Sequence, residues 1–174
     1  MKWASAISRQ TPLESAILEC VASLRQQLGE APAHLAATFV SPHYQEEYEQ
    51  LPQLVRQTLE APLVFGCSGG GVIGSGLEVE QQPAVSITAG SLPDVEMVGV
   101  HLDGDKLPDL DAGPQAWYDL VKVIPGQAPQ FVLLADPFSF PVQNLLMGLA
   151  FAFSQSAKIG GLASGAQQQG QNAI

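Results

Sequence analysis

Cys67 and Ser68 lie at the head of a glycine-rich stretch, Val-Phe-Gly-Cys-Ser-Gly-Gly-Gly-Val-Ile-Gly-Ser-Gly, which follows a short apolar run. Glycine permits positive φ and close backbone approach, so such a stretch can turn its amides towards a bound group. No Gly-Lys-Ser/Thr follows, which excludes a Walker A loop, and the glycines do not open a periodic helix as a dinucleotide fingerprint requires. The pattern predicts a strand end that faces a ligand, with these candidate contacts: Gly66, Cys67, Ser68, Gly69 and Gly70.

The Cys67 thiol has an alternative, catalytic interpretation. Nearby amides stabilise a thiolate, and a histidine can activate it as a nucleophile. His43 follows Ser41-Pro42 at the end of a predicted strand, so it is the candidate partner. No Asp or Asn is placed to complete a triad, and a small residue at this position also suits tight packing. Cys20, on the apolar stripe of a predicted helix, is expected in the core.

A second set of candidate residues follows a later pair of predicted strands. Asp136-Pro137 ends one of them, and the segment with Gly161, Ser164 and Gly165 ends the other. The spacing echoes that of Ser41-Pro42 and Ser68-Gly69, which indicates two βαβ-like units of equal internal length. Parallel strands of such units end at one edge of a sheet, where open α/β folds bind ligands. Ser68 and Ser164 would donate hydroxyls and Asp136 would bind an amine, although Ser-Gly and Asp-Pro are also ordinary turn sequences.

The elements that position these residues indicate an α/β (or α+β) fold, a mixed β-sheet flanked by about four helices. A capping box at Thr11–Glu14 and a terminal Gly29 delimit the first helix, and Pro52 kinks or divides the second. The third helix contains Trp117 and stops at Pro125-Gly126. The fourth, after Pro141, is apolar nearly all round, which predicts burial on more than one side. Strands are expected at 2–7, 35–40, 62–65, 77–80, 83–90, 95–102, 131–135 and 158–162.

Composition restricts the partners. The net charge of −10 argues against nucleic acid and anionic membranes. Charged residues make up only 14% of the chain, so we expect a signalling partner, a missing C-terminal half or a second copy to cover apolar surface. Residues 137–157 carry no charge but are too interrupted to span a membrane, and a buried helix is expected there. Residues 166–174 are glutamine-rich and patternless, and we expect them to be frayed.

Cofactor and compartment follow from the same counts. Two cysteines form no disulfide framework, and three histidines show no ligand spacing, so no metal site is expected. No cofactor is expected; haem is an alternative, because one histidine in an apolar pocket would suffice. The apolar part of the N-terminal nonapeptide is too short for a secretory signal, and a cytoplasmic protein is the simplest interpretation.

Several segments resemble the N-terminal part of the FIST domain (F-box and intracellular signal transduction proteins). They are Phe65–Gly74, Glu78–Glu80, Pro83–Ile87, Leu133–Phe140 and Lys158–Gly165. The resemblance covers most of residues 1–174 and implies an intracellular sensory module for small ligands, usually suggested to be amino acids. It also implies kinase, cyclase or F-box partners, and haem in some relatives that look like nitric oxide sensors. The family part normally continues into further strands and a C-terminal part, so the resemblance implies that residues 1–174 are a FIST N-terminal-type domain truncated before its last strands, either as an excised piece or as a natural fragment.

Three hypotheses therefore stand. The leading one is a sensory module that binds a small molecule. The second is a thiol-dependent enzyme that uses Cys67 and His43. The third is a protein-interaction scaffold whose apolar helix after Pro141 docks a partner.

Overall fold

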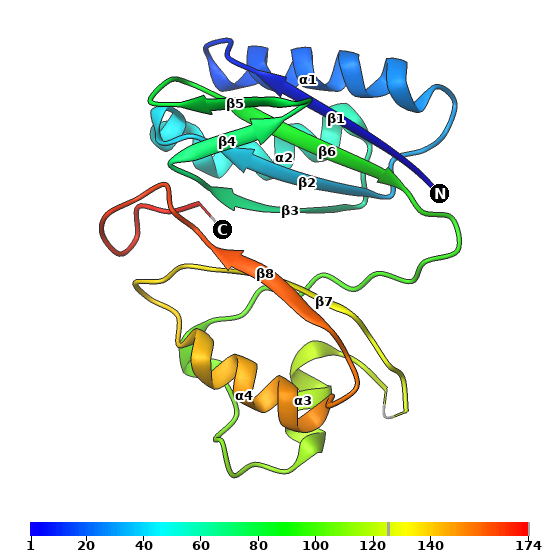
Figure 1. Ribbon diagram of the computed structural model, residues 1–174, viewed down its shortest axis with the longest axis vertical. Coiled ribbons are helices and arrows are strands. Elements are labelled where there is room, and N and C mark those ends of the chain that lie inside the picture. The colour runs from blue at the N-terminus through cyan, green and yellow to red at the C-terminus, as the bar shows by residue number, and fades with distance from the viewer. Residues whose placement is uncertain (125, 174) are drawn as a thin grey trace. The chain divides into compact units, whose positions relative to one another are not determined.

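The computed structural model describes residues 1–124 and 126–173 and divides the chain into two compact units. The first consists of residues 1–97 and 163–174, and the second of residues 98–162 (Figure 1). Pro125, which was expected to stop the third helix, lies outside the described residues, as does Ile174. Within the described residues, no helix combines the length and apolar character needed to cross a membrane.

The first unit is built on a four-stranded mixed sheet with strand order β1-β6-β2-β3. β2 and β3 are parallel, whereas β6 pairs antiparallel with both β1 and β2. The bounds are β1 Lys2–Ser8, β2 Leu35–Val40, β3 Leu63–Ser68 and β6 Val85–Ser91. The α/β fold with a mixed sheet is thus confirmed.

Two α-helices cover one face of this sheet: α1 (Leu13–Leu28) and α2 (Leu51–Leu59). The predicted apolar stripe of α1 is buried in full, Cys20 included, because this side of the helix packs against the sheet and α2. Gly29 ends the helix with φ 64°, as predicted. The predicted capping box is wrong. Pro12 is the N-cap and makes no side-chain cap bond, while the Leu13 amide donates to the Glu47 carboxylate at 3.1 Å.

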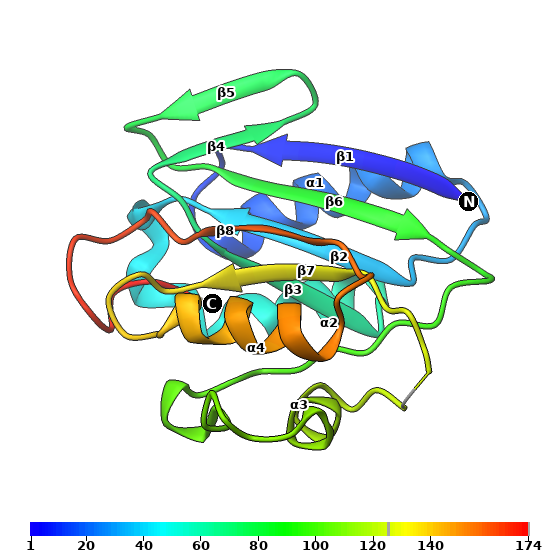
Figure 2. The ribbon, with the colours of Figure 1, turned by 60° about the horizontal axis from the view of Figure 1, so that its bottom comes forward.

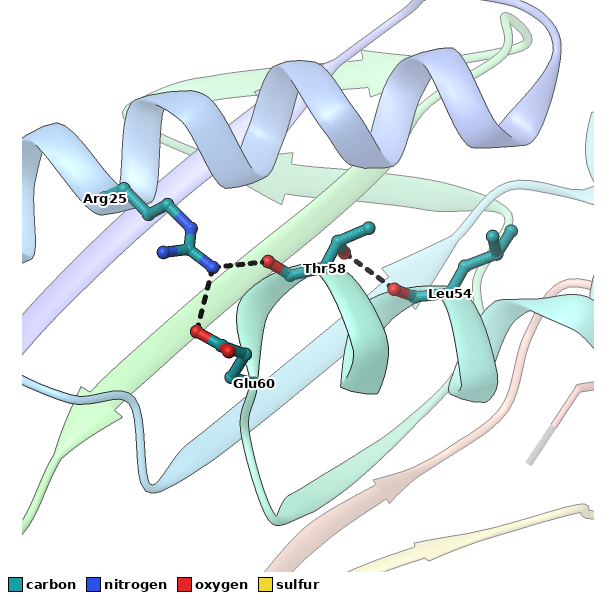
Figure 3. Close-up of polar contacts among 4 residues, drawn as sticks. All are labelled: Arg25, Leu54, Thr58 and Glu60. Atoms are coloured by element: carbon teal, nitrogen blue, oxygen red, sulfur yellow. Dashed lines mark hydrogen bonds and ion pairs between the residues drawn. The ribbon is translucent and has the colours of Figure 1, made fainter.

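The second predicted helix is divided, as the proline indicated. A 3₁₀-helix η1 (Pro42–Gln50) leads into α2, and Pro52 lies in the first turn of α2, where a missing amide costs no helical bond. Figure 3 shows how α2 is tied to α1: the Arg25 guanidinium donates to the Thr58 carbonyl at 2.7 Å and pairs with Glu60 at 3.3 Å. The Thr58 hydroxyl donates back to the Leu54 carbonyl at 2.6 Å.

The second half of the glycine-rich stretch is a hairpin of β4 (Gly71–Gly74) and β5 (Leu77–Glu80). Ser75 and Gly76 both have positive φ, which suits the two-residue turn of a twisted hairpin. Val72 and Val79 pack with Ala84 against Ile7 and Phe39, on the sheet face opposite the helices (Figure 2). The predicted strand at 77–80 is confirmed, and β4 is an element the sequence analysis missed.

The second unit contains a parallel strand pair joined by a helix. The described elements are a short 3₁₀-helix η2 (Gly104–Lys106), α3 (Pro114–Val121), β7 (Phe131–Ala135), α4 (Val142–Ala152) and β8 (Lys158–Leu162). Trp117 is fully buried against α4, and a Cβ on Gly148 would come within 2.0 Å of its ring. The glycine therefore sets how closely the two helices pack.

Three expectations fail in this unit. Residues 95–102 are not a strand, because no other described strand pairs with their alternating apolar residues. The helix α3 stops at Val121 rather than at Pro125-Gly126, since Lys122 turns left-handed with φ 57°. The helix α4 is buried on one side only: Leu145 and Leu149 are buried, whereas Met147 and Phe151 are 58% and 61% exposed.

The predicted repeat of βαβ units is confirmed in backbone detail. In β2–α2–β3 and in β7–α4–β8 the two strands are parallel neighbours. A Cβ on Gly66 would come within 1.7 Å of the Thr38 carbonyl oxygen, and one on Gly160 within 1.8 Å of the Leu133 carbonyl oxygen. In each unit a glycine of the second strand thus permits the same close approach to the first.

Candidate ligand-binding site

The segment Gly66–Gly70 begins as strand and leaves the sheet at Ser68. Gly66, Cys67 and Ser68 are the last residues of β3, paired with Thr38, Phe39 and Val40 of β2. The Gly69 amide donates to the Val40 carbonyl at 2.9 Å, so the chain is held to β2 one residue past the strand. Gly66 therefore serves strand packing, while Ser68, Gly69 and Gly70 form the turn at the carboxyl end of the sheet.

The turn at Ser164 meets this turn directly. The Ser164 amide donates to the Ser68 carbonyl at 3.1 Å, and the Gly70 amide donates to the Ser164 hydroxyl at 3.2 Å. A Cβ on Gly165 would come within 2.5 Å of the Ser68 Cβ, which only glycine avoids. We call residues 68–70 and 163–165 the paired turns. The structure brings together Ser68, Gly69, Gly70, Ser164 and Gly165 of the predicted set.

The residues of the paired turns differ in their exposure to solvent. Ser68 is fully buried, and Gly69 is buried beside it. Gly70 and Ser164 are exposed, so the amide of one and the hydroxyl of the other lie at the surface.

Residues 166–173 were expected to be frayed, and this is wrong at their end. The Ser68 hydroxyl donates to the Asn172 side-chain oxygen at 2.7 Å and accepts the Ala173 amide at 3.1 Å. The Ser68 amide donates to the Ala173 carbonyl at 2.9 Å. No periodic pattern in the sequence indicates this contact, because it depends on backbone groups and one amide side chain rather than on an apolar face.

The Cys67 thiol is buried, whereas its candidate partner His43 is exposed. Cys67 is 6% exposed, and burial raises the pKa of its thiol, so the thiolate is suppressed at neutral pH. His43 is exposed, and its Nδ1 lies 3.3 Å from the Ser41 hydroxyl. Burial also raises the pKa of the neighbouring Tyr48 phenol, an effect that a hydrogen bond with the Ser68 side chain offsets in part. This geometry gives no support to a thiol-dependent reaction.

The remaining predicted residues, Asp136 and Gly161, belong to the second unit. The Asp136 carboxylate accepts the Phe138 amide at 3.4 Å and the Ser139 hydroxyl, which is a local turn interaction. Gly161 is exposed in β8, and a Cβ there would meet no atom within 4 Å.

The second unit also contains a cavity of about 550 Å³ between the 104–111 segment and the first turn of α4. Its polar lining includes Asp109, Asp111 and Asn144. Neither the proline content of this segment nor its charges distinguish it from an ordinary surface connection.

The residues present do not fit a haem or a metal ion. A haem needs an axial ligand within an apolar pocket, but His43 and His101 are exposed and the Nδ1 of His34 accepts the Leu92 amide at 2.7 Å. In the described part of the chain, no three His, Cys, Asp or Glu side chains cluster as a metal site would require.

The fold is that of an α/β domain in which two turns that follow parallel strands touch. The sequence profile of the FIST N domain matches residues 34–174, and the chain belongs to this family. That membership associates it with signal transduction. The uncharacterized proteins MT0656 and Rv0628c, from two strains of Mycobacterium tuberculosis (CDC 1551 / Oshkosh and H37Rv), are each 25% identical over all 174 residues. The chain spans 44% of the length of either relative, and no solved structure matches it.

Proposed function

We propose that the chain is the sensory part of a signalling protein and binds a small molecule at the paired turns. The observation that carries the proposal is the direct contact of the two turns, through the Ser164 amide and the Ser68 carbonyl at 3.1 Å. Turns at the carboxyl ends of parallel strands are where open α/β folds bind ligands. Family membership supports a sensory role.

The chemistry of the paired turns suits a small polar molecule. Backbone amides, two serine hydroxyls and carbonyl oxygens gather there without a charged side chain among residues 68–70 and 163–165. Such groups recognise hydrogen-bonding ligands of both polarities, and amino acids carry both. The proposal includes no covalent step, since burial raises the pKa of the Cys67 thiol and disfavours the thiolate.

A thermal-shift screen of amino acids and nucleotides tests the proposal. A ligand that binds only the native state raises the free energy of unfolding by about 2.7 kcal/mol at a hundredfold excess over Kd. We expect at least one compound to raise Tm, and replacing Cys67 by Ala to leave its affinity within a few-fold. If no compound in the screen raises Tm, the sensory proposal fails.

The exposed side of α4 favours a second candidate function, the docking of a partner protein. Leu146, Met147 and Phe151 are 41%, 58% and 61% exposed on one helix. Exposed apolar patches of this kind mark interaction surfaces. Sedimentation of the wild type and of Phe151→Ser tests it: self-association that the substitution abolishes favours docking of a second copy, and a monomeric wild type excludes it.

A further inference from the structure

Asn172 and Ala173 occupy the polar groups of Ser68 that the proposed function would use. The Ser68 hydroxyl donates to the Asn172 oxygen and accepts the Ala173 amide, while its own amide donates to the Ala173 carbonyl. The Ser68 carbonyl is taken by the Ser164 amide. The amide, hydroxyl and carbonyl groups of Ser68 therefore each have a partner within the chain.

Apolar packing also holds residues 172–173 in place. Ala173 packs against the main core of the first unit, which Tyr48 and Leu54 border as well. Ser68 itself is fully buried. A ligand can therefore reach Ser68 only after residues 172–173 have moved away.

The groups that form hydrogen bonds with Ser68 indicate the kind of ligand that would bind there. They are a carboxamide oxygen, an amide N–H and a carbonyl oxygen, placed on two consecutive residues. Three hydrogen bonds of mixed polarity select a peptide-type ligand over an anion or an apolar molecule, because unmatched buried polar groups are costly.

We propose that Asn172-Ala173 is a built-in competitor for the site at Ser68, and that the ligand which displaces it carries the same carboxamide and peptide-amide groups. The inference rests on the proposed function, because it assigns that function's ligand class and its regulation. Only the fraction of molecules with the segment displaced binds ligand, so the apparent Kd equals the intrinsic Kd divided by that fraction. Weakening the Asn172 contact increases the fraction and tightens binding.

The test compares three forms of the full chain: wild type, Asn172→Ala and the matched control Gln171→Ala, whose side chain is exposed one residue away. The probe is N-acetyl-asparaginyl-alaninamide, with N-acetyl-alanyl-alaninamide as the analogue that lacks the carboxamide. Loss of one hydrogen bond corresponds to about a fivefold change in an equilibrium constant. We expect Asn172→Ala to bind the asparaginyl probe about fivefold more tightly than wild type and Gln171→Ala do, and the alanyl analogue to bind more weakly to all three.

Amide hydrogen exchange gives a readout that needs no ligand. The Ser68 amide should be protected in wild type and should exchange several-fold faster in Asn172→Ala, with no change in Gln171→Ala. Four results would each overturn the inference. In the binding experiment these are equal affinities of wild type and Asn172→Ala, equal binding of the two probes, or no binding at all. In the exchange experiment it is an unprotected Ser68 amide in wild type. The screen of free amino acids and nucleotides tests the proposed function separately. If a ligand raises Tm equally in wild type and Asn172→Ala, the proposed function is supported and the competitor role of Asn172-Ala173 is not.

Discussion

The carbonyl oxygen of Ser68 lies 3.1 Å from the amide nitrogen of Ser164, and this bond joins the end of β3 to the residues that follow β8. Ser68 is the last residue of β3, and Ser164 lies two residues past the end of β8. The two predicted turns therefore touch, although β3 and β8 belong to separate sheets.

Removal of the Ser164 hydroxyl should weaken ligand binding but change the free energy of unfolding little. Ser164→Ala keeps the amide bond to Ser68 but removes the acceptor of the Gly70 amide. Because Ser164 is exposed, the free energy of unfolding should change by less than about 0.5 kcal/mol. The affinity for a ligand found in the screen should fall about tenfold. Calorimetric titration measures it, with Ser154→Ala, another exposed serine, as control; equal affinities for the two variants would remove Ser164 from the site.

Gly66 should tolerate no side chain. Gly66→Ala places a methyl group within 1.7 Å of the Thr38 carbonyl, so β2 and β3 must separate. We expect a loss of about 2 to 3 kcal/mol in the free energy of unfolding, measured in urea. Gly161→Ala is the matched control, since its Cβ would meet open space. A similar loss in both variants would contradict the close-approach explanation.

The N-terminus of α1 should depend on a residue distant in sequence. Glu47→Ala removes the carboxylate that accepts the Leu13 amide, and should cost about 1 kcal/mol in the free energy of unfolding. Thr11→Ala should cost less, because Thr11 makes no cap bond. Urea unfolding measures the loss of free energy of unfolding in each variant. A larger loss for Thr11→Ala than for Glu47→Ala would support the predicted capping box.

Stability should fall in alkaline solution. Burial raises the pKa of the Cys20 thiol to about 12, and it raises that of Cys67 as well. Unfolded thiols have pKa values near 8.5, so above that pH the unfolded chain loses protons that the folded chain retains. This stabilising effect is complete below the unfolded pKa and is lost as pH rises towards the folded one, by up to about 1.4 kcal/mol per pH unit for each thiol.

Urea unfolding between pH 8 and pH 10 measures this slope. Cys20→Ala should lower stability at pH 8 through lost packing, and should flatten the dependence on pH. An unchanged slope in Cys20→Ala would show that this thiol ionises in the folded protein. In the same pH range Cys67 should react slowly with iodoacetamide, and fast labelling at pH 8 would revive the thiol-enzyme hypothesis.

The sequence identifies elements where local periodicity and burial agree. The stripe of α1 and the βαβ units around α2 and α4 were predictable because each apolar position meets the sheet or the facing helix. The first cap of α1 was not, since its acceptor Glu47 comes from η1. The strand expected at 95–102 shows the converse: alternation alone does not make a strand without a neighbour to pair with.

The sequence predicted that the candidate site consists of two turns. It did not predict which residues form hydrogen bonds with Ser68. Ser-Gly after two matched βαβ units placed Ser68 and Ser164 together. The occupation of Ser68 by Asn172 and Ala173 carries no sequence signal, because a glutamine-rich segment without periodicity gives no indication of where its backbone bonds end.

Chemical-shift mapping tests the central claim most directly. The ligand that raises Tm is titrated into ¹⁵N-labelled protein, and the amide resonances are followed. The account predicts that the largest shifts fall in the paired turns, residues 68–70 and 163–165. Shifts confined to the 104–111 segment or to α4, with the paired turns unmoved, would contradict it.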